Sequence, residues 1–282
     1  MLLDGKKLSL EILHSIQKEI EVSGSRKPAL ALIVVGSHPA SLSYIRGKKK
    51  ACEQIGMRSL VLEKSETISE RELLEEIEKL NLDPHIDGIL VQLPLPGHIN
   101  PAIVTEAIDP DKDVDGFHPL NMGKLLLGQE GGFIPCTPKG VFTLLQRFRV
   151  PVEGKHVVIV GRSNIVGKPL GALLMQKKEG CNATVTIAHS RSEHLKEITR
   201  SADVLIAAIG APLFLKKEMI KEGAAVIDVG INRNAEGKLV GDVDFEDVAK
   251  IAKWITPVPG GVGPMTIAML IENTFEGYKK HI

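Results

Sequence analysis

Two hydrophobic periods alternate along the chain, and together they predict parallel β-α-β units. Short apolar runs rich in β-branched residues are typical of strands that are buried on both faces. Such runs lie at residues 29–35, 60–62, 87–92, 156–160, 184–188, 204–209 and 225–229, with a last short strand at 254–255. Between the runs, apolar residues recur every three or four positions, which predicts amphipathic helices. The alternation of the two periods predicts an α/β fold.

Residues that start or stop regular structure mark the ends of several elements. Ser69 and Glu72 form a capping box at the start of one helix, and Pro94 and Pro96 end the strand before them. Further predicted segments are a helix from residue 8 that ends near Ser23 and Gly24, a helix at 39–55, a polar loop at 109–123, a helix at 140–149 and a final helix from residue 264. No internal repeat interrupts this order.

The stretch 155–169 joins a strand, a glycine turn and a helix start without interruption. The apolar run 156–160 ends at Gly161, and Pro169 is expected to be the first helical residue because its φ angle suits that position. Free amides at such a helix start hold a pyrophosphate in doubly wound domains. The glycine spacing differs from G-x-G-x-x-G, so a glycine turn without a ligand stays open at this point.

The strand 184–188 that follows carries a signal for the type of dinucleotide. A site that reads NAD usually has a carboxylate at the end of this strand, but here His189, Ser190 and Arg191 follow it. Together with Arg162 on the glycine turn, they offer guanidinium and hydroxyl groups, which match a 2′-phosphate. The sequence therefore favours NADP over NAD, with a merely solvated strand end as the alternative for Ser190 and Arg191.

Composition and charge narrow the class of partner. The chain has 282 residues, 30.6 kDa and 43% hydrophobic residues, enough for two domains. Its 35 basic residues balance 35 acidic ones, which gives no electrostatic footprint for a nucleic acid or an anionic membrane. We therefore expect small-molecule partners. No secretory signal is expected at the N-terminus, and no apolar run approaches a membrane span.

Cysteine and histidine usage adds an expectation about compartment and metals. The three cysteines Cys52, Cys136 and Cys181 lie far apart and form no C-x-x-C pair, which argues against a disulfide framework. A reducing compartment, the cytoplasm, fits this pattern. The nine histidines show no metal-ligand spacing, so no metal is expected. Cys136 is interpreted as structural, because no histidine base stands beside it in the sequence.

Several polar residues stand where chemistry is possible. Tyr44 and Lys48 are four residues apart on one predicted helix, so their side chains share a face. Gln92 ends a strand, where the ligand crevice of an open α/β sheet lies. Asp115 lies in the polar loop, and residues 256–264 form a rigid loop that ligands can approach closely. Each of these residues alone is more often a solvated, packing or connecting residue than a functional one.

Taken together, these stretches resemble the bifunctional methylenetetrahydrofolate dehydrogenase/cyclohydrolase family along nearly the whole chain. The strings that carry the resemblance are PASLSYIRGKKKACEQIG, GILVQLPLPGHI, DPDKDVDGFHPLNMGKL, PCTPKG, VVIVGRSNIVGKPL, ATVTIAHSRS, VIDVGIN and ITPVPGGVGPMT, in the order of the family. The resemblance implies oxidation of 5,10-methylenetetrahydrofolate with NADP and hydrolysis of the product to 10-formyltetrahydrofolate. It also implies a homodimer and a role in one-carbon metabolism and purine biosynthesis.

The resemblance also assigns roles to individual residues. Lys48 is implied as the principal catalytic residue, with Tyr44 against the folate, Gln92 supporting Lys48 and Asp115 anchoring the pterin. The cofactor-contacting positions are implied to be Gly161, Arg162, Ser163, Ser190 and Ile231, beside Arg191, and the loop that borders the folate is implied to be Pro259, Gly260 and Gly261. A lysine desolvated beside a developing cation could have its pKa lowered toward about 7 to 8, which suits hydrolysis.

The order of the elements and the apolar stripe of the final helix, together with the resemblance, predict the domain organisation. Residues 1–139 are expected to form a folate-binding catalytic domain, completed by a C-terminal helix at 265–282 that returns to it. Residues 140–264 are expected to form an NADP-binding, Rossmann-like domain with a doubly wound parallel sheet. A cleft between the two domains is expected to hold both reactions.

The chain departs from the family pattern at three positions, and two alternative functions are considered beside the family's. Leu42, Ser43 and Gly47 stand where the family has glutamine and often asparagine near the tyrosine and lysine, which leaves the surrounding hydrogen bonds open. Tyr44 and Lys48 also match the Y-x-x-x-K pair of short-chain dehydrogenases, but that pair follows the glycine turn, whereas here it precedes it. A nucleotide-sensing protein on the same scaffold would not need Lys48.

Overall fold

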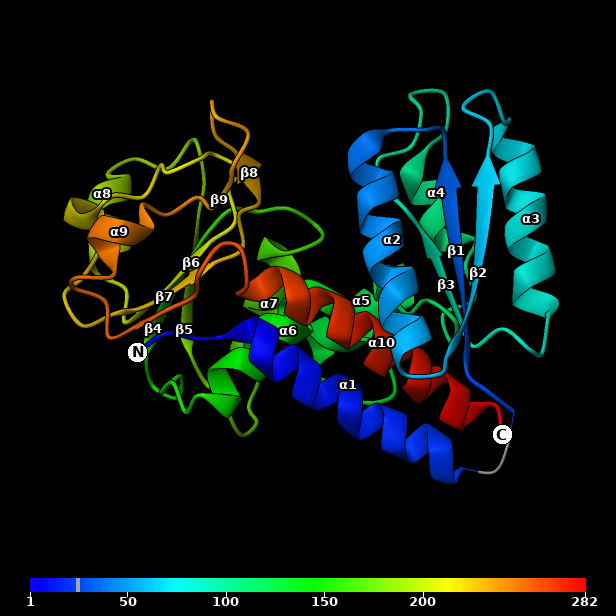
Figure 1. The fold of residues 1–282 in the computed structure, drawn as a ribbon. Coiled ribbons are helices and arrows are strands. Elements are labelled where there is room, and N and C mark those ends of the chain that lie inside the picture. Colours follow the sequence, from blue (N-terminus) through cyan, green and yellow to red (C-terminus); the bar gives the residue numbers. More distant parts are fainter. Residues whose placement is uncertain (24–25) are drawn as a thin grey trace. The chain divides into compact units, whose positions relative to one another are not determined.

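A computed structural model describes residues 1–23 and 26–282, with the backbone alone at residues 39–41 and 43. The chain forms two compact units (Figure 1). The β1 unit consists of Leu10–Lys124, Gln129–Cys136 and Ile267–Ile282. The β4 unit consists of Met1–Ser9, Leu125–Gly128 and Thr137–Thr266. Gly24, where the first helix was expected to end, lies outside the described residues; the helix α1 (Gly5–Val22) stops just before it.

The β1 unit is built on a parallel sheet with the strand order β2-β1-β3. The strands are β1 (Ala29–Val35), β2 (Arg58–Lys64) and β3 (Gly88–Val91). The central strand β1 is buried throughout, as its continuous apolar run predicts. The edge strand β2 is longer than the predicted 60–62, because its outer residues alternate between exposed and half-buried positions and include charged side chains.

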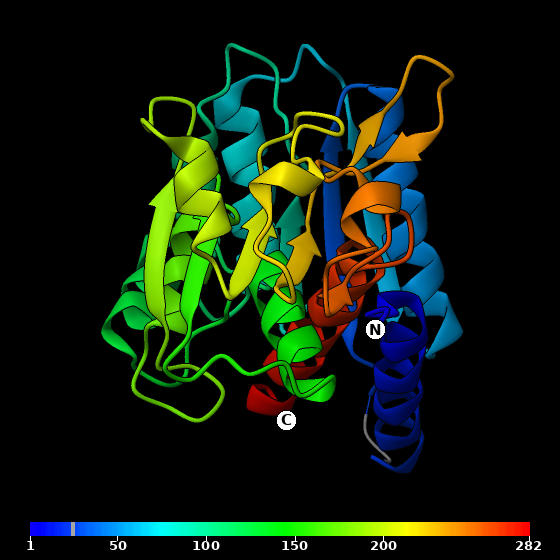
Figure 2. The same ribbon diagram turned by 90° about the vertical axis from the view of Figure 1, so that its left-hand side faces the viewer.

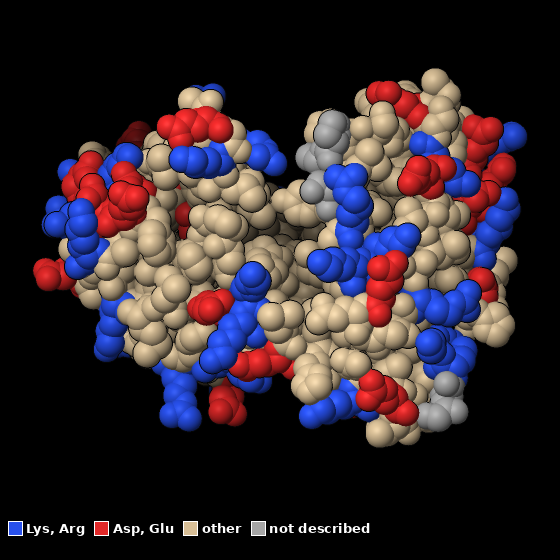
Figure 3. Space-filling view, in the orientation of Figure 1, with Lys and Arg blue, Asp and Glu red and all other residues tan. Residues whose placement is uncertain are grey.

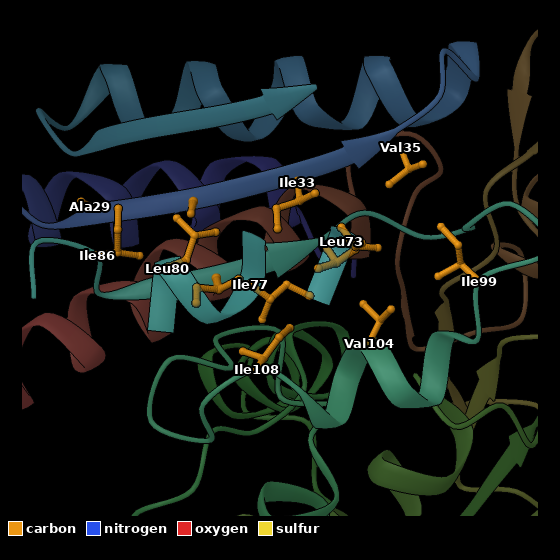
Figure 4. Packing of buried hydrophobic residues seen from close by; sticks show 13 residues of the cluster. Ala29, Ile33, Val35, Leu73, Ile77, Leu80, Ile86, Ile99, Val104 and Ile108 are labelled. Atoms are coloured by element: carbon orange, nitrogen blue, oxygen red, sulfur yellow. The ribbon is translucent and has the colours of Figure 1, made fainter. Parts of the chain in front are cut away.

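Helices cover both faces of this sheet. The helices are α2 (Pro39–Gln54), α3 (Glu70–Leu82) and α4 (Pro101–Glu106), and α2 lies on the opposite side of the sheet from α3 (Figure 1). Alternate residues of β1 pack against α3 and α4 in one apolar core (Figure 4). The predicted capping box is confirmed: the Ser69 side chain accepts from the Glu72 amide, and the Glu72 carboxylate accepts from the Ser69 amide at 2.9 Å.

The β4 unit contains a five-stranded parallel sheet with the order β10-β7-β6-β4-β5, whose strands run side by side in Figure 2. The strands are β4 (His156–Val160), β5 (Thr184–Ala188), β6 (Val204–Ala207), β7 (Ala225–Asp228) and β10 (Trp254–Ile255). The chain runs from β4 to β5 on one side and then returns to β6 on the other. The strand order therefore reverses at β4, which is where doubly wound sheets bind ligands.

The remaining elements connect these sheets. They are the helices α5 (Pro119–Leu127), α6 (Cys136–Arg147), α7 (Gly167–Leu174), α8 (Leu195–Arg200), α9 (Phe245–Val248) and α10 (Val262–Lys280), the 3₁₀ turn η1 (Lys217–Met219), and the short strands β8 (Asn232–Arg233) and β9 (Leu239–Val240).

Several other predicted boundaries were wrong. The first helix begins at Gly5 and not at residue 8, the strands expected at 204–209 and 225–229 end at 207 and 228, and the final helix begins at Val262 and not at residue 264. The polar loop expected at 109–123 ends earlier, because α5 begins at Pro119. The helix expected from 140 begins at Cys136, and α7 begins at Gly167 instead of Pro169. Pro138 and Pro169 therefore each occupy a later position of a first helical turn, where the missing N–H breaks no intrahelical bond.

The C-terminal helix returns to the first sheet, as predicted. From Ile267 onward, α10 belongs to the β1 unit. Its buried Asn273 donates to the carbonyl oxygens of Val114 and Ile134, at 2.8 and 3.1 Å. Gly277 packs against the backbone of Asp87, where a Cβ would meet the carbonyl oxygen at 2.5 Å. The helix thus fastens the loop between α4 and α5, which carries the candidate site residue Asp115.

Surface charge is mixed. On the face shown in Figure 3, basic and acidic side chains are interspersed over both units. Among the described residues, no helix combines the length and the apolar character that crossing a bilayer requires.

Candidate active site

Lys48 is a buried lysine on α2 with one neutral partner. Its residue is only 8% exposed, and its Nζ donates to Oε1 of Gln92 at 2.9 Å. Gln92 directly follows β3, and its own Nε2 donates to the Leu93 carbonyl at 2.8 Å, which turns the carbonyl oxygen toward the lysine. The structure thus joins Lys48 and Gln92 by a hydrogen bond. A neutral amide orients the amine without adding a charge.

Burial makes the charge of Lys48 costly. It lowers the pKa of Lys48, while the nearby Asp115 and the thiol of Cys136 act in the opposite direction. Burial likewise raises the pKa of Asp115, against the effects of Lys48 and of a hydrogen bond from Cys136. Groups whose pKa values are shifted by burial and by a charged neighbour cluster at functional sites, which makes Lys48 and Asp115 candidates for such a site.

The lowered pKa of Lys48 predicts a pH-dependent stability difference. In the unfolded chain Lys48 keeps an ordinary pKa, so the unfolded state binds more protons than the folded state between the two pKa values. The wild type should therefore gain stability relative to the Lys48→Met variant as pH rises through the folded pKa, at no more than about 1.4 kcal/mol per pH unit. Urea unfolding of both proteins from neutral pH upward measures this gain. A pH-independent difference would contradict it.

The loop that carries Asp115 is organised by a second carboxylate, Asp113. The buried Asp113 side chain accepts from the amides of Gly116, Phe117 and His118 at 3.2, 3.3 and 2.8 Å, and from Nδ2 of Asn121 at 2.9 Å. Burial raises the pKa of Asp113 to about 6. Sequence reasoning did not select Asp113 or Asn121, although the D-x-D-G spacing was a visible signal. This clamp fixes where the Asp115 side chain projects.

Cys136 and Tyr44 complete the surroundings of the lysine. The Cys136 thiol is buried at the start of α6, lies 3.3 Å from the Val114 carbonyl oxygen and bonds to the Asp115 carboxyl. It therefore stands beside the candidate site, a position that its sequence neighbours did not indicate. Tyr44 lies one helical turn before Lys48 but is 43% exposed, so its ring is available to a ligand.

The departures from the family pattern lie on the same helix. Leu42 is half-buried, and the side chain of Ser43 lies outside the described residues. A Cβ at Gly47 would meet Ile267 of α10 at 3.4 Å, an ordinary contact. Space for a small side chain therefore exists at position 47, and no backbone strain requires glycine there.

The glycine turn after β4 is shaped for close approach, but its helix amides are not free. The Ser163 hydroxyl accepts from the amides of Val166 and Gly167 at 3.1 and 3.5 Å, and its carbonyl accepts from Lys168. The expectation of free amides at this helix start was therefore wrong, because the turn caps its own helix. Gly161 has a φ of +132°, and a Cβ there would overlap the Ala208 carbonyl. The turn thus touches the loop after β6.

The glycine turn after β4 has the shape and the side chains that a dinucleotide-binding site requires. A side chain at Gly161 would fill the junction between the loops that follow β4 and β6, so glycine keeps backbone accessible at the switch point. Arg162 and Ser163 are exposed on the same turn. The backbone of this turn and the side chains of Arg162 and Ser163 can therefore hold the phosphates of a dinucleotide.

The other candidate cofactor residues lie at the same edge of the sheet. Ser190 and Arg191 occupy an exposed turn after β5, closed by the Ser192 hydroxyl, which accepts from the His189 amide at 3.0 Å. Ile231 follows β7 and is 45% exposed. Because the carboxyl ends of parallel strands share one edge, these residues line up with the glycine turn.

The predicted folate-bordering loop belongs to the β4 unit, whereas Lys48, Gln92 and Asp115 belong to the β1 unit. The peptide bond before Pro259 is cis, and Gly260 has a φ of +108°. The Gly260 carbonyl accepts from the Lys6 amide at 2.8 Å, which ties the loop to the start of α1. Gly261 is buried.

Known proteins match this chain over its whole length. The profile of the tetrahydrofolate dehydrogenase/cyclohydrolase catalytic domain matches residues 3–115, and that of the NAD(P)-binding domain of the same family matches residues 135–282. The chain is 55% identical to the "Bifunctional protein FolD" of Protochlamydia amoebophila over 286 residues, covering 99% of this chain and 98% of that protein.

Solved structures agree in fold. The FolD methylenetetrahydrofolate dehydrogenase/cyclohydrolase of Campylobacter jejuni is 50% identical, with a TM-score of 0.97 over 100% of this chain and 99% of that one. The Trypanosoma brucei FolD, complexed with NADP cofactor and inhibitor, is 36% identical, with a TM-score of 0.93 over 99% and 97%. The chain belongs to the tetrahydrofolate dehydrogenase/cyclohydrolase family.

Proposed function

We propose that this protein is a bifunctional one-carbon folate enzyme. It oxidises 5,10-methylenetetrahydrofolate to 5,10-methenyltetrahydrofolate with NADP, and it hydrolyses the product to 10-formyltetrahydrofolate. The observation that carries the proposal is the buried Lys48 amine, held by Gln92 and influenced by Asp115 and Cys136. A lysine that merely solvates a helix face would not be 8% exposed with a neutral amide as its hydrogen-bond partner.

Lys48 gives the hydrolytic step a physical basis. As water adds to the cationic methenyl carbon, the neutral amine of Lys48 accepts a proton from that water. The resulting ammonium then returns a proton to the folate nitrogen when the carbon–nitrogen bond breaks, and the other proton of the water leaves to solvent. Gln92 accepts a hydrogen bond from Nζ and so keeps the amine aimed throughout.

The oxidative step needs positioning more than proton transfer. When bound, NADP would supply the acceptor for the hydride that leaves the methylene carbon. The cation that remains is stabilised by the neighbouring folate nitrogens, so the protein mainly has to hold the substrate in place. We assign Asp115 to the pterin, whose adjacent N–H and amino groups one carboxylate can accept together. The exposed ring of Tyr44 offers a face to the folate, and Pro259, Gly260 and Gly261 are proposed to border it.

One measurement tests this function directly. Mixing the enzyme with NADP and 5,10-methylenetetrahydrofolate should produce the absorbance of reduced cofactor. Adding preformed 5,10-methenyltetrahydrofolate without NADP should then show its absorbance decay by hydrolysis. A nucleotide-sensing protein would bind NADP and produce neither change, and a dehydrogenase of another kind would not hydrolyse the methenyl compound.

The cofactor preference provides a prediction of its own. Arg162 and Arg191 are proposed to bind the 2′-phosphate of NADP, together with Ser190. A hydrogen bond to a charged group contributes about 1.5–3 kcal/mol, so Arg191→Ala should lower the ratio of kcat/KM for NADP to kcat/KM for NAD by about 10- to 150-fold. Steady-state kinetics with both cofactors measures the ratio, and hydrolysis of preformed methenyltetrahydrofolate should not change.

Arg200→Ala is the matched control for this variant. Arg200 is also exposed and lies in the last turn of α8 in the same unit, so its loss removes the same charge from a different place. The cofactor ratio should stay at the wild-type value. If Arg162→Ala, Arg191→Ala and the double variant all keep the wild-type ratio, the turn after β5 is only a solvated strand end.

Further proposals concern where and how the enzyme works. All three cysteines are buried free thiols, which supports a reducing compartment, and we place the enzyme in the cytoplasm.

We also propose a homodimer. Within the part of the chain that the structure describes, β5 is an outer strand paired with β4 alone, and it exposes Ile187, so its open edge is available to a second copy. Its product would serve one-carbon metabolism, including purine biosynthesis. Neither nucleic acid nor membrane is proposed as a partner.

The two functional regions are proposed as domains of the chain. Residues 1–139 with the C-terminal helix at 265–282 would bind folate, and residues 140–264 would bind NADP. The family matches at 3–115 and 135–282 support a division near this point.

A further inference from the structure

The β4 unit contains a buried carboxylate that sequence reasoning did not select. Asp242 is fully buried, and its side chain has four hydrogen-bond donors around it. Oδ2 accepts from the amides of Ile209 and Gly210 at 2.7 and 3.1 Å. Oδ1 accepts from the Ala211 amide at 2.9 Å and from Nδ2 of Asn232 at 2.8 Å. Three successive amides of one loop and one side chain from a second loop thus converge on a single carboxylate.

A second buried carboxylate holds Asp242 in place. Asp228, the last residue of β7, accepts from the amides of Asp242 and Val243 at 3.0 and 2.9 Å, and from the Gly230 amide at 3.0 Å. The contact is close, because a Cβ at Gly241 would overlap the Asp228 carboxylate, and a Cβ at Gly230 would overlap that of Asp242. Asp228 and Asp242 therefore form a carboxylate pair that joins three segments of the chain.

The segments that the pair joins follow strands β6 and β7. The loop 208–211 leaves the carboxyl end of β6, and residues 229–232 leave that of β7. Ala208 contacts Gly161, so the loop after β6 forms one wall of the switch point at β4. Ile231, a proposed cofactor contact, lies between two residues that the pair holds, Gly230 and Asn232.

We propose that Asp242 is a positioning residue for NADP binding, with Asp228 as its support. The inference rests on the proposed function and deepens it. Asp242 acts through the backbone: it sets the path of the loop after β6 and of the segment that carries Ile231. Because three consecutive amides bind one carboxylate, the loop is preorganised before the cofactor arrives, and little ordering remains to be done on binding.

A carboxylate is chemically suited to this task. All four groups that face it are donors, and an ionised carboxylate has only acceptors, about four sites on its two oxygens. An asparagine of the same size would present an NH₂ group to one pair of these donors. The isosteric Asp242→Asn variant therefore turns two attractive contacts into donor–donor conflicts without creating a cavity.

Kinetics of the full-length enzyme can separate positioning from a general structural role. In Asp242→Asn, KM for NADP should rise by about 10- to 100-fold, while KM for 5,10-methylenetetrahydrofolate stays within about 3-fold of the wild type. Hydrolysis of preformed 5,10-methenyltetrahydrofolate needs no cofactor, so it should keep the wild-type rate. A wild-type enzyme active in both assays establishes the proposed function independently of the variant.

Asp203→Asn is the matched control. Asp203 precedes β6 at the opposite end of the same strand, where it accepts from the His156 amide at 3.0 Å and from Nζ of Lys221 at 2.6 Å. This variant changes the same residue type in the same unit and should leave KM for NADP unchanged. An unchanged KM for NADP in Asp242→Asn, or an equal rise in both variants, would overturn the proposal.

A milder variant covers the case in which Asp242→Asn does not fold. Asn232→Ala removes one of the four donors and leaves the three loop amides bound to Asp242. KM for NADP should rise by about 3- to 10-fold, again with unchanged hydrolysis. A KM for NADP at the wild-type value in this variant would also count against the proposal.

Discussion

Replacing Lys48 with methionine should lower hydrolysis of 5,10-methenyltetrahydrofolate by about 10²- to 10⁴-fold, the usual contribution of a general acid–base group. Methionine fills most of the space of the lysine stem but can neither accept nor give a proton. Because Lys48 lies in the β1 unit and the glycine turn lies in the β4 unit, folding and NADP binding should persist. Hydrolysis is followed by the decay of methenyltetrahydrofolate absorbance, and NADP binding by calorimetry.

Lys49→Met is the control for this experiment. Lys49 is the next residue on α2, but its side chain is 53% exposed and lies 3.8 Å from the exposed Glu53. An exposed pair of this kind contributes little to stability, and its loss should leave both activities intact. Hydrolysis at the wild-type rate in Lys48→Met would remove the proposed mechanism. Loss of NADP binding as well would point to a folding defect instead of a catalytic one.

Asp115→Asn should raise KM for the folate substrates by about 10- to 150-fold, because the pterin would lose a charge-assisted hydrogen bond worth about 1.5–3 kcal/mol. The amide would also turn one donor toward the donors of the pterin. A second effect follows from the electrostatics, since the charge of Asp115 raises the pKa of Lys48. Without that charge the pKa of Lys48 should fall further, and the acid limb of the hydrolysis profile should move to lower pH.

Both effects can be measured in one set of experiments. Steady-state rates of hydrolysis at several pH values give KM for methenyltetrahydrofolate and the position of the acid limb. Asp111→Asn is the matched control, since Asp111 lies in the same loop but is exposed and pairs with Lys280 at 3.2 Å. It should change neither quantity. A wild-type KM in Asp115→Asn would refute the role of Asp115 in pterin binding.

The fold followed largely from periodicity. Strands β1, β4, β5 and β10 coincide with their predicted ranges. β1 and β4 are nearly continuous apolar runs, which are typical of buried parallel strands, and β5 alternates threonine with apolar residues. Errors arose at helix starts, because a first turn accepts proline at later positions. Pro169 and Pro264 were read as first helical residues, and Pro138 was placed before its helix, but α7, α10 and α6 each begin two residues before these prolines. The helix α5 was missed because its short length and polar flanks gave no period.

The residues of the candidate site differ in the same way: some follow from local sequence spacing, and others depend on contacts that only the folded chain makes. Tyr44 and Lys48 share a helix, and Gln92 ends a strand, so local spacing was enough to select them. Asp113 and Asp242 act through hydrogen bonds to backbone amides, and an amide leaves no trace in the type of its residue. The free amides expected at Gly167 failed for a related reason: Ser163 supplies the cap within its own turn.

By itself, the sequence determined the strands of the two parallel sheets, the longer amphipathic helices and the family. These features depend on the polarity of each side chain and on the spacing of apolar residues, and both can be read directly from the sequence. Only the tertiary structure decided that the Lys48 amine is buried against Gln92, that Cys136 lies beside Asp115, and that carboxylates brace the loops at the sheet edges. Those features depend on burial and on contacts between residues distant in sequence, such as the 44 positions that separate Lys48 from Gln92. No local pattern encodes that kind of contact.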